Sequence, residues 1–296
     1  MFRGSMVALA TPMHADGTID WYKMEQLIEW HIQSGTDAII SVGTTGESAT
    51  LNFDEHKAVV RFTVDIVKKR IPVIAGAGAN STKEAVELST AVYQAGADAT
   101  LQVAPYYNKP PQRGLYAHFE TIAHAVPLPL ILYNVPSRTA CDISPATTVA
   151  LSKIGNIVGI KEASTLERLR ELRPLFSRER AFKIFSGEDG NAAEAVCEGL
   201  IDGIISVTAN VAPHDVSEMM RLGLAGDKAA CMAINERIAP LHQVLFCEAN
   251  PIPTKWALWR MGLIDSGIRL PLVTLAEEKQ AEVEAVLRAL QISLKD

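Results

Sequence analysis

Short apolar runs alternate with amphipathic stretches along most of the chain. Each run is nearly continuous in apolar and β-branched residues, a pattern typical of parallel strands that are buried on both faces of a sheet. Eight such runs occur, at residues 6–12, 38–43, 72–78, 99–105, 128–136, 157–163, 182–188 and 203–210. The sequence therefore predicts eight strands with helices between them.

The residues between these runs repeat with helical spacing. One predicted helix has an apolar face made of Trp21, Met24, Leu27, Ile28 and His31. Two more helices are predicted at residues 84–94 and 112–125. From about residue 213 the pattern is helical only, and it ends in a predicted helix at residues 276–290. Gly or Pro marks most junctions between elements.

Eight strand–helix units within about 225 residues predict a closed (β/α)8 barrel, the α/β TIM barrel. We expect the barrel to occupy residues 1–224 and a C-terminal helical extension, packed on the barrel, to occupy residues 225–296. A doubly wound open sheet is the competing architecture. It is expected to carry a phosphate or dinucleotide fingerprint at its first turn, and the first turn here, ATPMHADG, has none.

Composition narrows the possible partners. The chain has 296 residues, 48% of them hydrophobic, and a formal net charge of −6, which argues against a basic nucleic-acid-binding face. No apolar run approaches the roughly 20 residues that span a bilayer, so no membrane partner is expected. The four cysteines are widely spaced and form no C-x-x-C pair, which predicts reduced thiols in a cytoplasmic protein.

The carboxyl ends of TIM-barrel strands, and the loops that follow them, carry the active site. In this sequence those positions are residues 43–47, 105–108, 133–138, 161–163, 186–188 and 208–210. They offer one amine, tyrosines, hydroxyls and an arginine. They lack the clusters of histidines and carboxylates that bind metals, so no metal is expected.

Lys161 is the most informative of these residues, because it interrupts the apolar run IVGI-K-EA. Burial disfavours an ammonium group relative to a free amine, and a free amine forms a Schiff base with a carbonyl substrate. The alternative is a structural lysine buried against a carboxylate, with Glu162 or Glu188 as its partner.

Tyr133 ends the strand that neighbours Lys161, and its phenol can transfer protons if Thr44 and Tyr107 form a hydroxyl relay. Alternatively, Tyr133 is a core aromatic residue. The GTTGE loop offers backbone N–H groups and hydroxyls suited to a carboxylate, or it is an ordinary turn. Arg138 follows a rigid Val-Pro-Ser turn and could bind a carboxylate in bidentate fashion, or it forms a surface salt bridge.

Six motifs resemble those of the dihydrodipicolinate synthases (4-hydroxy-tetrahydrodipicolinate synthases). They are GTTGES, APYYNKP, YNVPSRT, GIKEAS, SGED and SVTANVAP, in matching order and spacing, and the similarity covers essentially the whole chain. The wider superfamily of class I pyruvate-dependent aldolases shares the loop after strand 2, the Tyr and the Lys. Arg138 and the paired tyrosines favour the synthases over N-acetylneuraminate lyases and keto-deoxy sugar aldolases.

The resemblance implies a mechanism that needs no cofactor. Lys161 would condense with pyruvate to an imine, and the derived enamine would attack L-aspartate-4-semialdehyde. Tyr133 would be the general acid/base, with Thr44 and with Tyr107 from a neighbouring subunit as its relay. Substrate binding would fall to Thr45, Ile205, Gly187 and Arg138. Thr45 and the backbone near Ile205 would hold the pyruvate carboxylate, and Arg138 the semialdehyde carboxylate.

The resemblance also implies a homo-oligomer, a tetramer built as a dimer of dimers, and inhibition by L-lysine. The matching lysine-site residues are Ser48, Ala49, His56, Asn80, Glu84 and Tyr106. Phe53 departs from the pattern, because well-known enterobacterial members carry His there. Two other readings are an aldolase of sialic acid or keto-deoxy sugars and a catalytically inactive barrel that binds lysine.

Overall fold

Eight parallel strands close into a barrel in which each strand pairs with the next along the chain and β8 pairs with β1. The computed structural model describes residues 2–176 and 182–295. The strands are β1 (Gly4–Ala8), β2 (Ala38–Ser41), β3 (Val73–Gly76), β4 (Ala99–Val103), β5 (Leu130–Asn134), β6 (Ile157–Glu162), β7 (Lys183–Ser186) and β8 (Gly203–Ser206). The predicted α/β TIM barrel is therefore confirmed.

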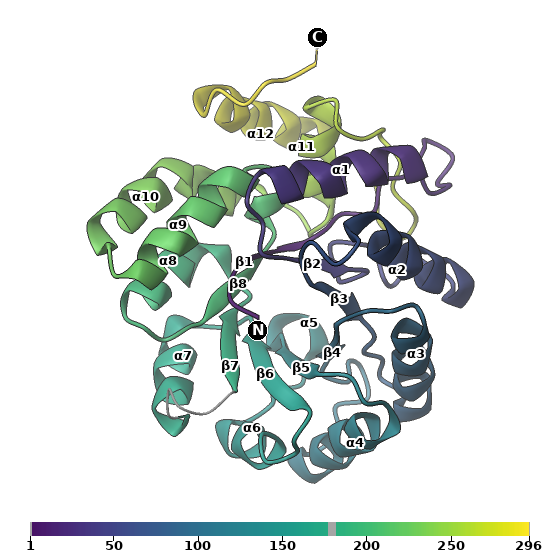
Figure 1. Cartoon of the computed structure of the whole chain (residues 1–296). Helices are drawn as coiled ribbons and strands as arrows, with labels where there is room; N and C mark the ends of the chain where they lie inside the picture. Colours follow the sequence, from purple (N-terminus) through teal and green to yellow (C-terminus); the bar gives the residue numbers. More distant parts are fainter. Residues whose placement is uncertain (1, 177–181, 296) are drawn as a thin grey trace.

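Helices surround the barrel, as the view along its axis shows (Figure 1). Those that follow the strands are α1 (Trp21–Gln33), α2 (Phe53–Val67), α3 (Thr82–Gln94), α4 (Gln112–Ala125), α5 (Pro136–Thr139), α6 (Pro145–Leu151), α7 (Leu166–Leu172), α8 (Asp189–Cys197) and α9 (Pro213–Ala225). Two short 3-10 helices lie at Arg173–Leu175 and Thr208–Asn210. No helix of residues 2–176 and 182–295 is long and apolar enough to span a membrane.

Most predicted runs extend past the strands at their carboxyl ends. The run at 6–12 continues beyond β1 because Leu9 and Ala10 are buried although they are not in the strand. At its other end β1 begins earlier than predicted, at Gly4, whose φ is +85°. A Cβ atom at Gly4 would lie 2.1 Å from a carboxylate oxygen of Asp37, so only glycine fits this start.

Alternation along the strands divides the core in two. The barrel interior contains Met6, Ile40, Leu101, Ile131, Tyr133, Phe185 and Ile205. Residues one position away, such as Val7, Ile39, Leu132 and Ile160, pack instead between the barrel and its helices. Because successive side chains of a strand point to opposite faces, Lys161 shares the inner face with Tyr133, while Asn134 and Glu162 lie on the outer face.

Three helices follow the barrel: α10 (Lys228–Val244), α11 (Ile252–Arg260) and α12 (Glu277–Ala289). In Figure 1, α11 and α12 lie beside α1 at one side of the ring. Their apolar residues, including Leu241, Trp256 and Leu287, form a separate core together with Val207 and Val211 after β8. The last helix of the barrel, α9, ends at Ala225, one residue beyond the expected boundary. The division into two domains stays a prediction.

Candidate active site

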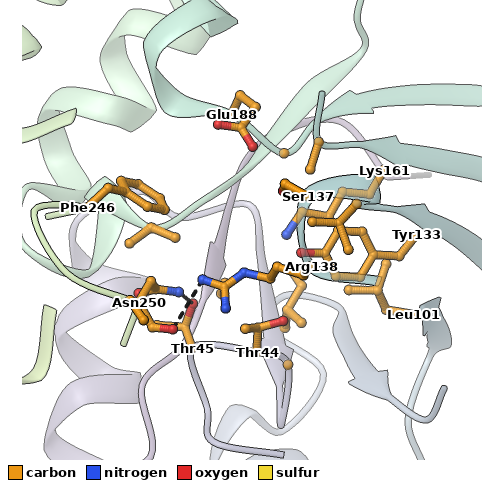
Figure 2. A pocket seen from close by; sticks show the side chains of 18 of the residues that line it. Thr44, Thr45, Leu101, Tyr133, Ser137, Arg138, Lys161, Glu188, Phe246 and Asn250 are labelled. Carbon is orange, nitrogen blue, oxygen red and sulfur yellow. Dashed lines mark hydrogen bonds between the residues drawn. The ribbon is translucent and has the colours of Figure 1, made fainter. Parts of the chain in front are cut away.

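A cavity of about 390 Å³ lies at the carboxyl ends of the strands (Figure 2). Six residues predicted from the sequence line it: Thr44, Thr45, Tyr133, Arg138, Lys161 and Gly187. They come from the ends of β2, β5, β6 and β7. Residues far apart in the sequence therefore meet here because parallel strands end at one face of the barrel.

Lys161 and Tyr133 are direct neighbours across β5 and β6. Lys161 is 5% exposed, and its Nζ lies 4.3 Å from the centroid of the Tyr133 ring. Gly187 makes room for this amine, since a Cβ atom there would lie 2.7 Å from Lys161 Cε. In the described part of the chain Lys161 forms no salt bridge, so the ion pair with Glu162 or Glu188 considered from the sequence is not formed; the Lys161 charge acts on Glu188 only at a longer distance.

Glu188 lies at the rim of the same cavity, above the amine in Figure 2. Burial raises the pKa of its carboxyl, and the neighbouring Asp189 charge adds to this effect, while Lys161 and Arg138 act in the opposite direction. The cavity therefore contains a carboxyl that keeps its proton to a higher pH than an exposed carboxyl does.

The loop after β2 is tightly folded. Glu47 donates from its N–H to the Thr44 carbonyl at 3.1 Å, and Ser48 donates to the Gly43 carbonyl at 3.3 Å. Glu47 itself has a φ of +58°, a conformation uncommon outside glycine. Thr45 is buried beneath the cavity. The loop thus presents Thr44 and Thr45 from a fixed backbone.

Arg138 lies in α5, the single helical turn that begins at Pro136 of the Val-Pro-Ser sequence. Its guanidinium donates to the Asn250 carbonyl at 3.2 Å and otherwise faces the cavity (Figure 2). Among the residues that the structure describes, it has no carboxylate partner, so the surface salt bridge considered from the sequence is not formed. The guanidinium therefore has donors available to a substrate carboxylate.

Tyr107 and Ile205 lie outside this cavity lining. Tyr107 is 88% exposed and has a φ of +74°, so it projects into solvent from the loop after β4. Ile205 is buried inside the barrel in β8. Within the described residues, no group of three or more His, Cys, Asp or Glu side chains is placed to hold a metal ion.

Sequence reasoning missed the contribution of the C-terminal extension. Asn250 lines the cavity and donates from Nδ2 to Thr45 Oγ1 at 2.9 Å. Lys255 of α11 forms a buried ion pair with Glu47. Burial lowers the pKa of Lys255, while the Glu47 carboxylate acts in the opposite direction. The only signal in the sequence was the NPIPTK segment, whose Asn and Lys stand in an otherwise apolar stretch.

A second cavity, of about 310 Å³, adjoins the first and shares Thr44 and Tyr133 with it. Four predicted lysine-site residues line it: Ser48, Ala49, His56 and Tyr106. Asn80 and Glu84 are not in this lining, but Asn80 donates to the Tyr106 carbonyl at 3.2 Å. Burial and the Glu84 charge raise the pKa of Tyr106. His56 donates from Nε2 to the Gly76 carbonyl at 2.7 Å.

Comparison with known proteins relates this geometry to one family. The model of the dihydrodipicolinate synthetase family matches residues 1–290. A 4-hydroxy-tetrahydrodipicolinate synthase of Dichelobacter nodosus is 60% identical over 295 residues, covering 100% of this chain and 99% of the relative.

Two solved structures are similar over nearly the whole chain. A chloride-inhibited dihydrodipicolinate synthase from Acinetobacter baumannii, complexed with pyruvate, has a TM-score of 0.96 at 50% identity, covering 99% of this chain and 100% of that one. A synthase from Cyanidioschyzon merolae with lysine bound has a TM-score of 0.94 at 37% identity, covering 98% and 99%. The chain belongs to the dihydrodipicolinate synthetase family and is a lyase-type aldolase.

Proposed function

We propose that this protein condenses pyruvate with L-aspartate-4-semialdehyde to form 4-hydroxy-tetrahydrodipicolinate, a step of the diaminopimelate route to L-lysine. The observation that carries the proposal is the buried amine of Lys161 against the Tyr133 ring, in a cavity that is also lined by the Arg138 guanidinium. The pyruvate complex of the Acinetobacter relative supports the choice of keto acid.

The reaction begins with attack of Lys161 Nζ on the pyruvate ketone. Loss of water gives a protonated imine, which withdraws electrons so that a methyl proton can leave. The resulting enamine forms a carbon–carbon bond to the aldehyde of the second substrate. The substrate amine then attacks the imine carbon, expels Lys161 and closes the ring. Tyr133 transfers the protons of these steps, with Thr44 as the first member of its relay.

Two carboxylates must be held during the reaction. Thr45 and the backbone near Ile205 are assigned to the pyruvate carboxylate, and Gly187 leaves the space in which the imine forms. Arg138 is assigned to the semialdehyde carboxylate, because its guanidinium has donors to spare at the mouth of the cavity. A sugar aldolase would keep Lys161 and Tyr133 but has less use for a guanidinium placed there.

Tyr107 completes the relay from a neighbouring subunit in this proposal. Its side chain is exposed and is not part of the lining of its own cavity, which suits a residue that acts on a second copy. The functional unit is then a dimer, and we assign a tetramer built as a dimer of dimers. The four unpaired cysteines suit the reducing cytoplasm.

L-Lysine is the proposed inhibitor, and the lysine-bound relative supports this assignment. It would occupy the cavity lined by Ser48, Ala49, His56 and Tyr106, with Asn80 binding its carboxylate and Glu84 its ammonium group. Because Thr44 and Tyr133 border both cavities, a ligand in the second one can disturb the proton relay.

The test is borohydride reduction in the presence of pyruvate, followed by mass spectrometry of tryptic peptides. The peptide carrying Lys161 is expected to gain the mass of a reduced pyruvyl group, and Lys161→Ala serves as control. A coupled assay with both substrates, with and without millimolar lysine, then measures condensation and inhibition. If that peptide gains no mass, the Schiff-base mechanism is overturned. The remaining hypothesis is then the catalytically inactive barrel that binds lysine.

A further inference from the structure

A second pair of side chains lies on the face of the sheet opposite to Tyr133 and Lys161. Asn134 follows Tyr133 and Glu162 follows Lys161, and the two are register partners across β5 and β6. Both side chains are buried, with 0% and 1% exposed respectively. They lie between the sheet and its helices, outside the cavity, because successive strand residues alternate between faces.

Hydrogen bonds join this second pair. Asn134 Nδ2 donates to both carboxylate oxygens of Glu162, at 3.1 and 3.0 Å, and to Asp142 Oδ1 at 2.8 Å. Asn134 Oδ1 accepts from the Ile143 N–H at 2.9 Å. The amide therefore uses both its donors and its acceptor, which fixes its orientation.

Charged groups surround Glu162 on that side. Arg168 of α7 donates to Asp142 at 2.8 Å and forms a salt bridge with Glu171 at 3.3 Å. Burial raises the pKa of Glu162 to about 7, the Asp142 charge adds to this, and Asn134 and Arg168 act against it. Near neutral pH the Glu162 carboxyl is therefore only partly ionised.

The backbone pairing of β5 with β6 is irregular. The register shifts between Leu130 and Ile131, so that Leu130 pairs with Ile157 but Ile131 pairs with Gly159. A register shift interrupts the ladder and lets the strands twist locally. The Asn134–Glu162 hydrogen bonds lie at the other end of the same strand pair, next to the reacting groups, where they join the two strands in addition to the backbone ladder.

We infer that Asn134 and Glu162 are positioning residues that hold Tyr133 and Lys161 in register for imine formation. The inference rests on the proposed function of Lys161. These two residues, called the Asn134–Glu162 clamp from here on, act through the backbone, since neither side chain enters the cavity. A displacement of about 1 Å between reacting groups can cost about 100-fold in rate, so a modest loosening of two strands is measurable.

The hydrogen bonds of the Asn134–Glu162 clamp depend on the charge of Glu162. The ionised carboxylate accepts the Asn134 bonds with both oxygens, whereas the protonated group turns one oxygen into a hydroxyl. Imine formation is therefore expected to gain from ionisation of Glu162 as the pH rises through about 7. This dependence separates a positioning role from a merely structural one.

The experiment measures the rate of cyanoborohydride trapping of pyruvate on Lys161, by intact mass, from pH 6 to pH 8. Glu162→Gln is expected to trap about tenfold more slowly than wild type at pH 8 and at a similar rate at pH 6, with the pyruvate concentration for half-maximal rate unchanged. Asp37→Asn is the matched control, a carboxyl at the other end of the barrel that accepts from the Ser5 N–H.

Asp142→Asn is the second variant, because its side chain is partly exposed and the amide can still accept from Asn134. Removing this charge lowers the pKa of Glu162, so the rise in trapping rate is expected to move to lower pH. If wild type traps pyruvate but both Glu162→Gln and Asp142→Asn show the wild-type dependence of trapping rate on pH, the positioning role is overturned and the proposed function is not affected. Failure of wild type to trap pyruvate overturns the proposed function and this inference with it.

Discussion

Asn250 donates a hydrogen bond to the Thr45 hydroxyl at 2.9 Å, across a sequence separation of 205 residues. Its backbone carbonyl accepts from Arg138 at 3.2 Å, so one residue contacts the groups assigned to both substrate carboxylates. Thr254 donates in turn to Asn250 Oδ1 at 3.0 Å. The segment after α10 is therefore part of the candidate active site.

Asn250→Ala is expected to raise KM for pyruvate about tenfold and to affect the semialdehyde less. The substitution removes the amide that orients Thr45 but keeps the carbonyl that holds Arg138. Leaving a buried hydrogen-bonding group without its partner costs about 1–3 kcal/mol. Steady-state kinetics with each substrate varied measures the difference. Thr254→Val, which leaves the bond to Thr45 in place, is the control, and equal changes in both KM values would contradict the assignment.

Gly187→Ala is expected to reduce pyruvate trapping on Lys161 by about 100-fold while the protein still folds. The added methyl group would lie 2.7 Å from Lys161 Cε and 2.6 Å from the Ala163 Cβ, so the amine must move. Gly190→Ala is the matched control, because a Cβ atom at that position of α8 meets nothing within 4 Å. Trapping by Gly187→Ala at the wild-type rate would contradict the prediction that the added methyl group displaces the Lys161 amine.

The barrel and most of its cavity were predictable because both follow from local pattern. Continuous apolar runs mark strands buried on both faces, and the carboxyl ends of such strands meet at one face. Lys161 was recognisable because it is a lysine within an otherwise largely apolar run that forms a buried strand. The strand ends were less predictable, because buried loop residues such as Leu9 extend the same apolar pattern.

The long-range ion pairs and hydrogen bonds around the site were not predictable from local sequence pattern. Glu47 and Lys255 are 208 residues apart, and nothing in either segment specifies the other. Likewise, the bond between Asn134 and Glu162 depends on the register of β5 and β6. Such pairs become visible only when the packing of the elements is known.

Lys255→Met is expected to lower the free energy of unfolding by about 3–5 kcal/mol, because it leaves the Glu47 carboxylate buried without its cation. The double variant Glu47→Gln with Lys255→Met is expected to recover much of this loss. Denaturant unfolding of the four proteins of this double-mutant cycle measures the coupling. Simple addition of the two single effects would show that the pair contributes no coupling.

His31 is expected to make the protein less stable as the pH falls below about 6.5. Its ring is fully buried against Thr36, and burial lowers the pKa of His31 from 6.5 to about 3. Between these values the unfolded chain binds a proton that the folded chain does not, which costs up to about 1.4 kcal/mol per pH unit. Urea unfolding at several pH values should show a shallower slope for His31→Gln than for wild type. His124→Gln, at an exposed site, should keep the wild-type slope.

Tyr107 is expected to act on the cavity of a neighbouring subunit, which mixing of two inactive variants can test. Lys161→Ala lacks the amine and Tyr107→Phe lacks the relay hydroxyl, so each alone should have little condensation activity. In a mixed dimer, one cavity combines the intact Lys161 of one chain with the intact Tyr107 of the other. Co-expression in equal amounts should therefore restore about a quarter of the sites, as random pairing in a two-fold dimer requires. If Tyr107 instead served its own chain, no mixed dimer would contain an intact site, and activity would stay at the level of the single variants.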